Sequence, residues 1–89
     1  DAEQMGMIYK VVEDDKLMET ALDCANTLSQ MPTKGIALTK KLLNEGTINT
    51  FEKQLTREKE EQAKAASTYD YNEGVNAFLE KRQPVFKGE

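Results

Sequence analysis

Residues 70–88 read DYNEGVNAFLEKRQPVFKG and carry more structural signals than any other part of this 89-residue chain. Asp70 and Glu73 have the spacing of a capping box, in which two side chains accept each other's backbone hydrogen bonds at a helix start. Pro84 cannot continue a helix, so the helix is expected to end before it. A basic tail follows, with Phe86 as an aromatic plug. The expected inward stripe of the helix comprises Tyr71, Val75, Phe78, Leu79 and Arg82.

Gly74 lies in the first turn of this expected helix, where it costs about 1 kcal/mol relative to alanine. We expect the cost to be offset by close backbone packing against a neighbouring helix.

Two helices are expected before residue 46. Asp14 or Asp15 caps the first, residues 15–29, whose apolar residues form one broad stripe. The second begins with Pro32 in its first turn and ends near Asn44. The stripe of the first helix comprises Leu17, Met18, Ala21, Leu22, Ala25 and Leu28.

A third helix is expected from a capping box at residues 49–52 to about Ala66. Its inner face offers only Ala63 and Ala66 after Phe51 and Leu55, and most of its middle is charged. Either it is a solvated surface helix, or its small residues let another helix approach closely. The composition favours the surface helix.

The first twelve residues form a different kind of segment. Residues 1–6 have the pattern of a last helical turn, with Gly6 just beyond it. Residues 7–12, rich in β-branched and aromatic side chains, predict a short strand, for which the chain offers no second strand. Because the chain does not begin with Met, we expect it to be cut from a longer protein.

The composition excludes several function classes. Lys and Arg number 12 against 16 Asp and Glu, a net charge of −4, which disfavours a nucleic-acid binder. There is no histidine and Cys24 is the only cysteine, so neither an internal disulfide nor a usual zinc site is expected. A single thiol suits a reducing, cytoplasmic setting. No apolar run is long enough for a membrane span, and no signal peptide opens the chain.

No catalytic or metal-binding residue is predicted. The chain lacks the glycine-rich phosphate-binding and nucleophile-elbow motifs. The acids at residues 13–15 suit a helix start, and Cys24 suits a packed thiol. The residues therefore do not predict a self-sufficient enzyme.

The tail carries the one candidate ligand site. Lys81, Arg82 and Lys87 are close together in the sequence and are flanked by Phe78 and Phe86. Such cations can hold the phosphates of a nucleotide-like ligand. Alternatively, they complement a helix dipole while the aromatic residues pack in the core. On the residues alone, the second interpretation is favoured.

Several of these segments together resemble the crotonase superfamily, the enoyl-CoA hydratase/isomerase family. The family's closing motif, Asp-(Tyr/Phe)-x-Glu-Gly-x-x-Ala-Phe-x-x-Lys-Arg, is similar to residues 70–82. Residues 2–12, 17–28 and 32–40 resemble the segments that precede it. Residues 49–55 and the closing motif are similar to the phenylacetate-degradation subgroup, the epoxyphenylacetyl-CoA isomerase type. The resemblance covers essentially the whole chain.

The resemblance implies that this chain is the C-terminal helical region of a crotonase fold. Residues 1–12 would be a remnant of the core domain, and residues 13–89 a helical oligomerisation domain. Its partners would be its own core domain, neighbouring subunits in a trimer or hexamer, and acyl-CoA. From its acidic charge and its lack of a long apolar run, it is expected to bind neither nucleic acid nor membrane. The parent enzyme would act on acyl-CoA in phenylacetate or fatty-acid degradation, with the CoA thioester as substrate and no cofactor.

The resemblance also implies site residues. In many family members the lysine of the closing motif approaches the CoA nucleotide, and Lys81 occupies that position. Lys87, from the same basic tail, is expected to assist it. The oxyanion donors and acid–base carboxylates of the family belong to its core, so this chain alone is expected to be inactive. Two alternatives stay open: a standalone four-helix acyl-CoA carrier, and a helical adaptor that binds only protein.

Overall fold

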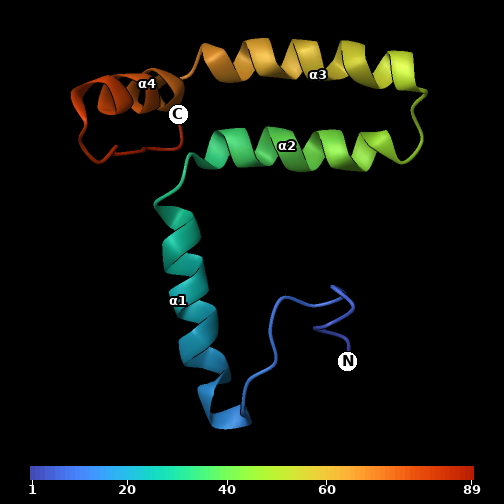
Figure 1. Ribbon diagram of the computed structural model, residues 1–89, viewed down its shortest axis with the longest axis vertical. Helices are drawn as coiled ribbons and strands as arrows, with labels where there is room; N and C mark the ends of the chain where they lie inside the picture. The colour runs from blue at the N-terminus through green and yellow to red at the C-terminus, as the bar shows by residue number, and fades with distance from the viewer.

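The computed structural model describes residues 1–89 and contains four α-helices and no β-strand (Figure 1). The 3₁₀ turn η1 (Asp14–Lys16) leads into α1 (Leu17–Ser29). It is followed by α2 (Thr33–Gly46), α3 (Phe51–Ala66) and α4 (Tyr69–Glu80). The prediction of an all-α chain of about four helices after a short N-terminal segment is confirmed.

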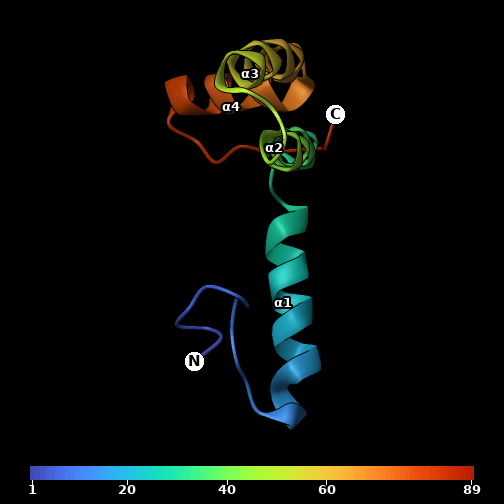
Figure 2. The same cartoon turned by 90° about the vertical axis from the view of Figure 1, so that its right-hand side faces the viewer.

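The helices form an open arrangement. α2 and α3 lie side by side and antiparallel, and α4 continues beyond the end of α3 (Figure 1). α1 points away from the other three helices, as the turned view in Figure 2 also shows. The radius of gyration is 16.7 Å, whereas a compact chain of this length has about 12 Å. α1 therefore stands outside the body formed by α2, α3 and α4.

The chain has almost no apolar core of its own. Only four residues are buried, and Ala77 is the only apolar one; the others are Glu61, Thr68 and Asp70. The accessible surface is 7482 Å², against about 5,300 Å² for a compact protein of this mass. The difference, about 2,200 Å², is surface that a compact chain would cover. Large apolar side chains are exposed on every helix, among them Leu17, Met18, Leu22, Leu43, Phe51, Phe78 and Leu79.

The N-terminal segment confirms one prediction and corrects another. Gly6 has a φ of 73°, and the N–H groups of Gly6 and Met7 bond to the carbonyls of Glu3 and Ala2 at 3.0 and 2.9 Å. These bonds are those of a Schellman helix ending, as predicted. The strand at residues 7–12 is wrong: the segment is irregular, because no second strand is present to form a ladder. The N–H of Val11 donates instead to the Glu3 carboxylate at 2.7 Å.

The starts of the first two helices differ from prediction. Neither Asp14 nor Asp15 caps α1, because both lie inside the 3₁₀ turn that precedes it, and no side chain caps that turn or α1. Pro32 is the N-cap of α2, one residue before the predicted place, and α2 runs on to Gly46, past Asn44.

α3 ends at Ala66 as predicted, but its cap is different. The Thr50 side chain accepts the hydrogen bond from the N–H of Lys53 at 3.3 Å. Asn49 is not the cap; its amide donates to Gln54 Oε1 at 3.0 Å. The predicted cap is therefore wrong by one residue, and the structure shows no capping box at residues 49–52.

Candidate functional site

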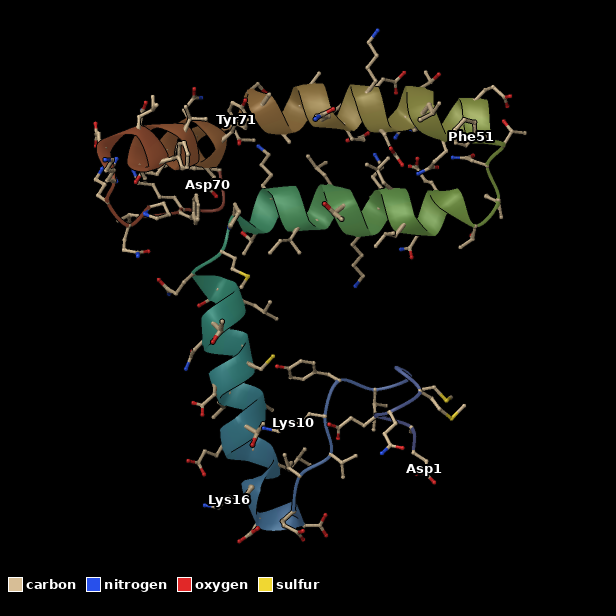
Figure 3. The ribbon with its side chains drawn as sticks, in the orientation of Figure 1. Asp1, Lys10, Lys16, Phe51, Asp70 and Tyr71 are labelled. Atoms are coloured by element: carbon tan, nitrogen blue, oxygen red, sulfur yellow. The ribbon has the colours of Figure 1, made fainter.

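Asp70 lies at the start of α4 and is buried, with 2% of its surface exposed. The prediction that Asp70 caps the helix is wrong. Thr68 is the cap, and its side chain accepts from the N–H of Tyr71 at 3.1 Å. The Asp70 carboxylate turns instead to the tail: Oδ1 accepts from the N–H of Lys87 at 2.7 Å and Oδ2 from that of Gly88 at 2.8 Å. Figure 3 shows Asp70 and Tyr71 beside the junction of α3 and α4, far from Phe51. Asp70 thus fastens the end of the tail to the start of α4.

Glu73 fastens the middle of the same tail. Its carboxylate accepts from both terminal nitrogens of Arg82, at 2.6 and 2.9 Å, and from the N–H of Val85 at 2.9 Å. The hydrogen bonds from Arg82 and Val85 lower the pKa of Glu73 to about 2, against the opposing effect of burial. Glu73 therefore does not complete the predicted capping box with Asp70.

The face of α4 that packs inward carries polar and small side chains. Asp70 and Ala77 are buried, and Glu73 and Gly74 are partly covered. The predicted inward stripe is wrong for this chain: Phe78 is 82% exposed, and Tyr71, Val75, Leu79 and Arg82 are also exposed. The tail occupies the inner side, so the apolar side faces outward.

Gly74 approaches the tail and not another helix. A Cβ atom on Gly74 would lie 3.6 Å from Cε1 of Phe86, an ordinary van der Waals distance. The predicted contact with a neighbouring helix is therefore wrong, whereas Phe86 packs on α4 as the predicted plug.

An open apolar groove follows from this arrangement. It has a volume of about 470 Å³ and lies between the start of α2, the outward face of α4 and the tail. Its apolar lining comprises Pro32, Ala65, Tyr71, Val75, Phe78, Leu79 and Phe86.

Lys81, the main predicted site residue, follows the last residue of α4. Its backbone is left-handed, with φ 55° and ψ 41°. Its side chain is exposed and takes part in no hydrogen bond or ion pair of the structure. Lys81 is therefore a free cation at the C-terminal end of α4.

Lys87, the second predicted site residue, lies at the other end of α4. Its ammonium nitrogen is 4.2 Å from the centre of the Tyr69 ring, a cation–π contact. Twelve residues of helix place the two ends of α4 about 18 Å apart. Arg82 is engaged by Glu73 and by Glu80. The three cations that are close in sequence therefore do not form one cluster.

A charged cluster that was not predicted from the sequence joins α2 to α3. Glu61 is 1% exposed, and its Oε1 accepts from Lys41 (3.1 Å), Arg57 (2.7 Å) and Lys64 (2.9 Å). Arg57 also binds the Glu45 carboxylate at 2.8 and 3.2 Å. α3 is therefore not simply a solvated helix, because Arg57 and Glu61 pack along α2.

This cluster shifts the acidity of its members. Lys64 and Lys41 are the main causes that lower the pKa of Glu61 to about 2, against the desolvation of its buried carboxyl. Arg57 lowers the pKa of Glu45, and Glu45 in turn raises that of Arg57. These shifts keep Glu45, Arg57 and Glu61 charged at neutral pH, which suits structural ion pairs better than proton transfer.

The inner face of α3 also differs from prediction. Ala63 and Ala66 are exposed, whereas Gln54, Arg57, Glu61 and Ala65 are covered. The amide of Gln54 donates to the carbonyl of Leu42 in α2 at 3.0 Å. In the sequence, this covered face is marked by long polar side chains that recur at helical spacing.

The structure contains no group of three or more Cys, Asp or Glu side chains placed to hold a metal ion. Cys24 is half-buried on α1. No helix is long and apolar enough to cross a membrane.

Comparison with known proteins extends these findings. The chain matches the enoyl-CoA hydratase/isomerase family model over residues 1–89. It is 43% identical to 1,2-epoxyphenylacetyl-CoA isomerase of Escherichia coli K12, a match that covers 99% of this chain and 34% of that protein. It is 31% identical to 2,3-dehydroadipyl-CoA hydratase of the same organism, covering 98% and 34%.

A solved structure gives the same result for the fold. The enoyl-CoA hydratase of Bacillus anthracis superposes on this chain with a TM-score of 0.83 and 31% identity, covering 99% of this chain and 34% of that one. The chain thus spans about a third of the length of the relatives it matches.

Proposed function

Because this chain belongs to the enoyl-CoA hydratase/isomerase family, we propose that it forms the C-terminal helical part of an enzyme acting on acyl-CoA thioesters. Its role is to pack against the core of that enzyme and against neighbouring subunits, and to supply part of the CoA site. The reacting groups are proposed to lie outside this chain. Its covered carboxylates are held in structural ion pairs and hydrogen bonds, which does not suit them to acid–base catalysis. The chain by itself is expected to be inactive.

For the substrate, we propose an aromatic acyl-CoA of phenylacetate degradation. The support is the 43% identity to 1,2-epoxyphenylacetyl-CoA isomerase, against 31% to 2,3-dehydroadipyl-CoA hydratase. Fatty-acid degradation is the alternative. A cytoplasmic setting is proposed because the single thiol of Cys24 suits reducing conditions.

The observation that carries the packing role is the uncovered apolar surface. The excess of about 2,200 Å² over a compact chain is as large as the area buried in obligate subunit interfaces. Residues 1–12 would join the core domain, and residues 13–89 would form the helical unit that holds subunits together. We propose trimers, which can pair into hexamers.

For the CoA site, we propose Lys81 as the main contact and Lys87 as a second one. Lys81 is supported by its exposure and its lack of an ion-pair partner. An ammonium group suits the 3′-phosphate or the diphosphate of CoA as a point charge. Because the two lysines lie at opposite ends of α4, they would contact separate parts of the ligand.

A graft tests the packing role. In this graft, the present chain replaces the matched third of E. coli 1,2-epoxyphenylacetyl-CoA isomerase. We expect it to form the host's oligomer in light scattering and to turn over the host's substrate, while the host without that third does neither. Full assembly and turnover by the shortened host would contradict the packing role.

A paired variant of the graft locates the surface. Phe78→Ser with Leu79→Ser should abolish assembly, because both side chains belong to the outward face of α4. Lys53→Ser with Lys59→Ser, which changes exposed lysines on α3, should leave it unchanged. Equal assembly of both variants would place the interface elsewhere.

A standalone acyl-CoA carrier is the competing function. It would need an enclosed ligand site, whereas the apolar groove beside α4 is open and the chain buries a single apolar residue. Calorimetry of the 89-residue chain with a long-chain acyl-CoA separates the two. Micromolar binding would favour the carrier over the proposed role.

A further inference from the structure

Lys81 is the only non-glycine residue of the chain with a positive φ. A Cβ atom disfavours this left-handed conformation, and glycine usually occupies such a position after a helix. Two backbone bonds close the turn: the N–H of Lys81 to the carbonyl of Phe78 at 3.3 Å, and that of Arg82 to the carbonyl of Ala77 at 3.0 Å. An unfavourable conformation persists only where neighbouring contacts enforce it.

Glu73 supplies such contacts on the other side of the turn. Oε1 accepts from Arg82 Nη1 at 2.6 Å and from the N–H of Val85 at 2.9 Å, and Oε2 accepts from Arg82 Nη2 at 2.9 Å. The Glu73 side chain is only 10% exposed, so these bonds are shielded from water. Together they fasten Arg82 and Val85, one and four residues after Lys81, to the second turn of α4.

The same contacts decide which cation is free. Arg82 binds Glu73 with two nitrogens and Glu80 with a third, so its guanidinium is already engaged by carboxylates. Lys81 has no such partner. With its backbone fixed, an anion that binds Lys81 has to order only the side chain, and less ordering on binding means higher affinity.

We propose that Glu73 is a positioning residue for Lys81. Through Arg82 and Val85 it holds the lysine in the left-handed turn from which its ammonium meets a phosphate group of CoA. Glu73 itself touches no ligand. This inference rests on the proposed CoA contact of Lys81. It adds the residue that fixes the backbone conformation from which Lys81 makes that contact.

A double-mutant cycle in the grafted enzyme tests it, with KM for the acyl-CoA and kcat as readouts. Lys81→Met is expected to raise KM about two- to fivefold, the range of an exposed charge contact, with kcat unchanged. Glu73→Gln should raise KM by a similar factor while Lys81 is present and have no further effect in the Lys81→Met background. Lys53→Met, at an exposed lysine on α3, is the matched control and should leave KM unchanged.

Arg82→Lys provides a second cycle should Glu73→Gln fail to assemble. It keeps the charge but loses the two-pronged contact with Glu73, so an intermediate rise in KM is expected.

The outcomes separate the two claims. Suppose that Lys81→Met raises KM. The positioning role is overturned, and the CoA contact stands, if Glu73→Gln and Arg82→Lys leave KM unchanged. The same holds if these two variants raise KM as much in the Lys81→Met background as they do with Lys81 present. If Lys81→Met leaves KM unchanged, the CoA contact itself fails, and the positioning role fails with it. A rise in KM from Glu73→Gln that depends on Lys81 supports both.

Discussion

Asp70 and Lys87 are 17 residues apart in the sequence, yet the N–H of Lys87 donates a 2.7 Å hydrogen bond to Asp70 Oδ1. The other oxygen accepts from the N–H of Gly88 at 2.8 Å. Asp70→Asn turns an NH₂ group toward one of these donors, which should cost about 1–3 kcal/mol of tail stability. Hydrogen exchange at the amides of Lys87 and Gly88 should accelerate. Asp23→Asn, at an exposed residue of α1, is the control; equal exchange in both variants would contradict the role of Asp70.

Glu61→Gln is expected to destabilise the α2–α3 hairpin. The change leaves Lys41, Arg57 and Lys64 around a neutral side chain, so the three charge-assisted hydrogen bonds to the buried Glu61 carboxylate weaken. The melting temperature of the chain should fall by several degrees. Glu52→Gln, at an exposed residue of α3, should leave it nearly unchanged, and a fall of the same size there would point to net charge as the cause.

Acid should weaken the structure in a defined pH range. Hydrogen bonds from Lys64 and Arg82 hold the pKa values of Glu61 and Glu73 at about 2, below the ordinary 4.5. A carboxyl with a lowered folded pKa stabilises the folded state above pH 4.5, and this contribution is lost as pH falls toward 2. Urea unfolding between pH 6 and pH 2 measures the loss. The double variant Glu61→Gln, Glu73→Gln should flatten the profile; an unchanged slope would refute the assignment.

Lys81→Gly should separate stability from ligand binding. Glycine adopts the left-handed backbone without a Cβ penalty, so we expect a gain of about 1 kcal/mol in the free energy of unfolding. The KM of the grafted enzyme for acyl-CoA should rise, because the ammonium is gone. A variant that loses stability while keeping its KM would show that Lys81 has a structural role instead.

Two glycines of the tail region should respond oppositely to alanine. At Gly74 a Cβ meets the Phe86 ring at an ordinary 3.6 Å, so Gly74→Ala should stabilise α4 by about 0.5–1 kcal/mol. At Gly88, φ is 77° and a Cβ would lie 2.6 Å from Oγ1 of Thr33. Gly88→Ala should therefore loosen the tail. Thermal unfolding of both variants checks the signs, and a shared sign would contradict this account of the tail.

The helices were predictable because their signals are local. Gly6 and Ala66 mark helix ends by backbone conformation or by the limit of a periodic pattern, and both can be read from neighbouring residues. The helix starts were less predictable, because Thr50 and Thr68 lie within two residues of equally suitable caps. Which side chain caps a helix depends on what else the competing residue can bind, and Asp70 binds the tail.

The faces of the helices could not be predicted in the same way. An apolar stripe such as Tyr71, Val75 and Phe78 marks the side that avoids water, but it does not say which molecule covers that side. In this chain the charged side of α3 and the polar side of α4 make the internal contacts, through Glu61, Asp70 and Glu73. Lys81 and Lys87 were identified as candidates, but their separation along α4 depends on the path of the tail, which no local pattern encodes.

The charged contact between α2 and α3 has a calorimetric consequence. Heat capacity rises when apolar surface meets water and falls when polar surface does. The side chains that bond α3 to α2 are carboxylates, an ammonium group, a guanidinium and an amide, and the chain buries one apolar residue. Melting of the lone chain should therefore be accompanied by a small heat-capacity increment. When a partner surface covers the outward apolar side chains of α1 and α4, the heat capacity should change by a large negative amount. The large heat-capacity change that usually accompanies folding would therefore accompany, for this chain, its association with a partner.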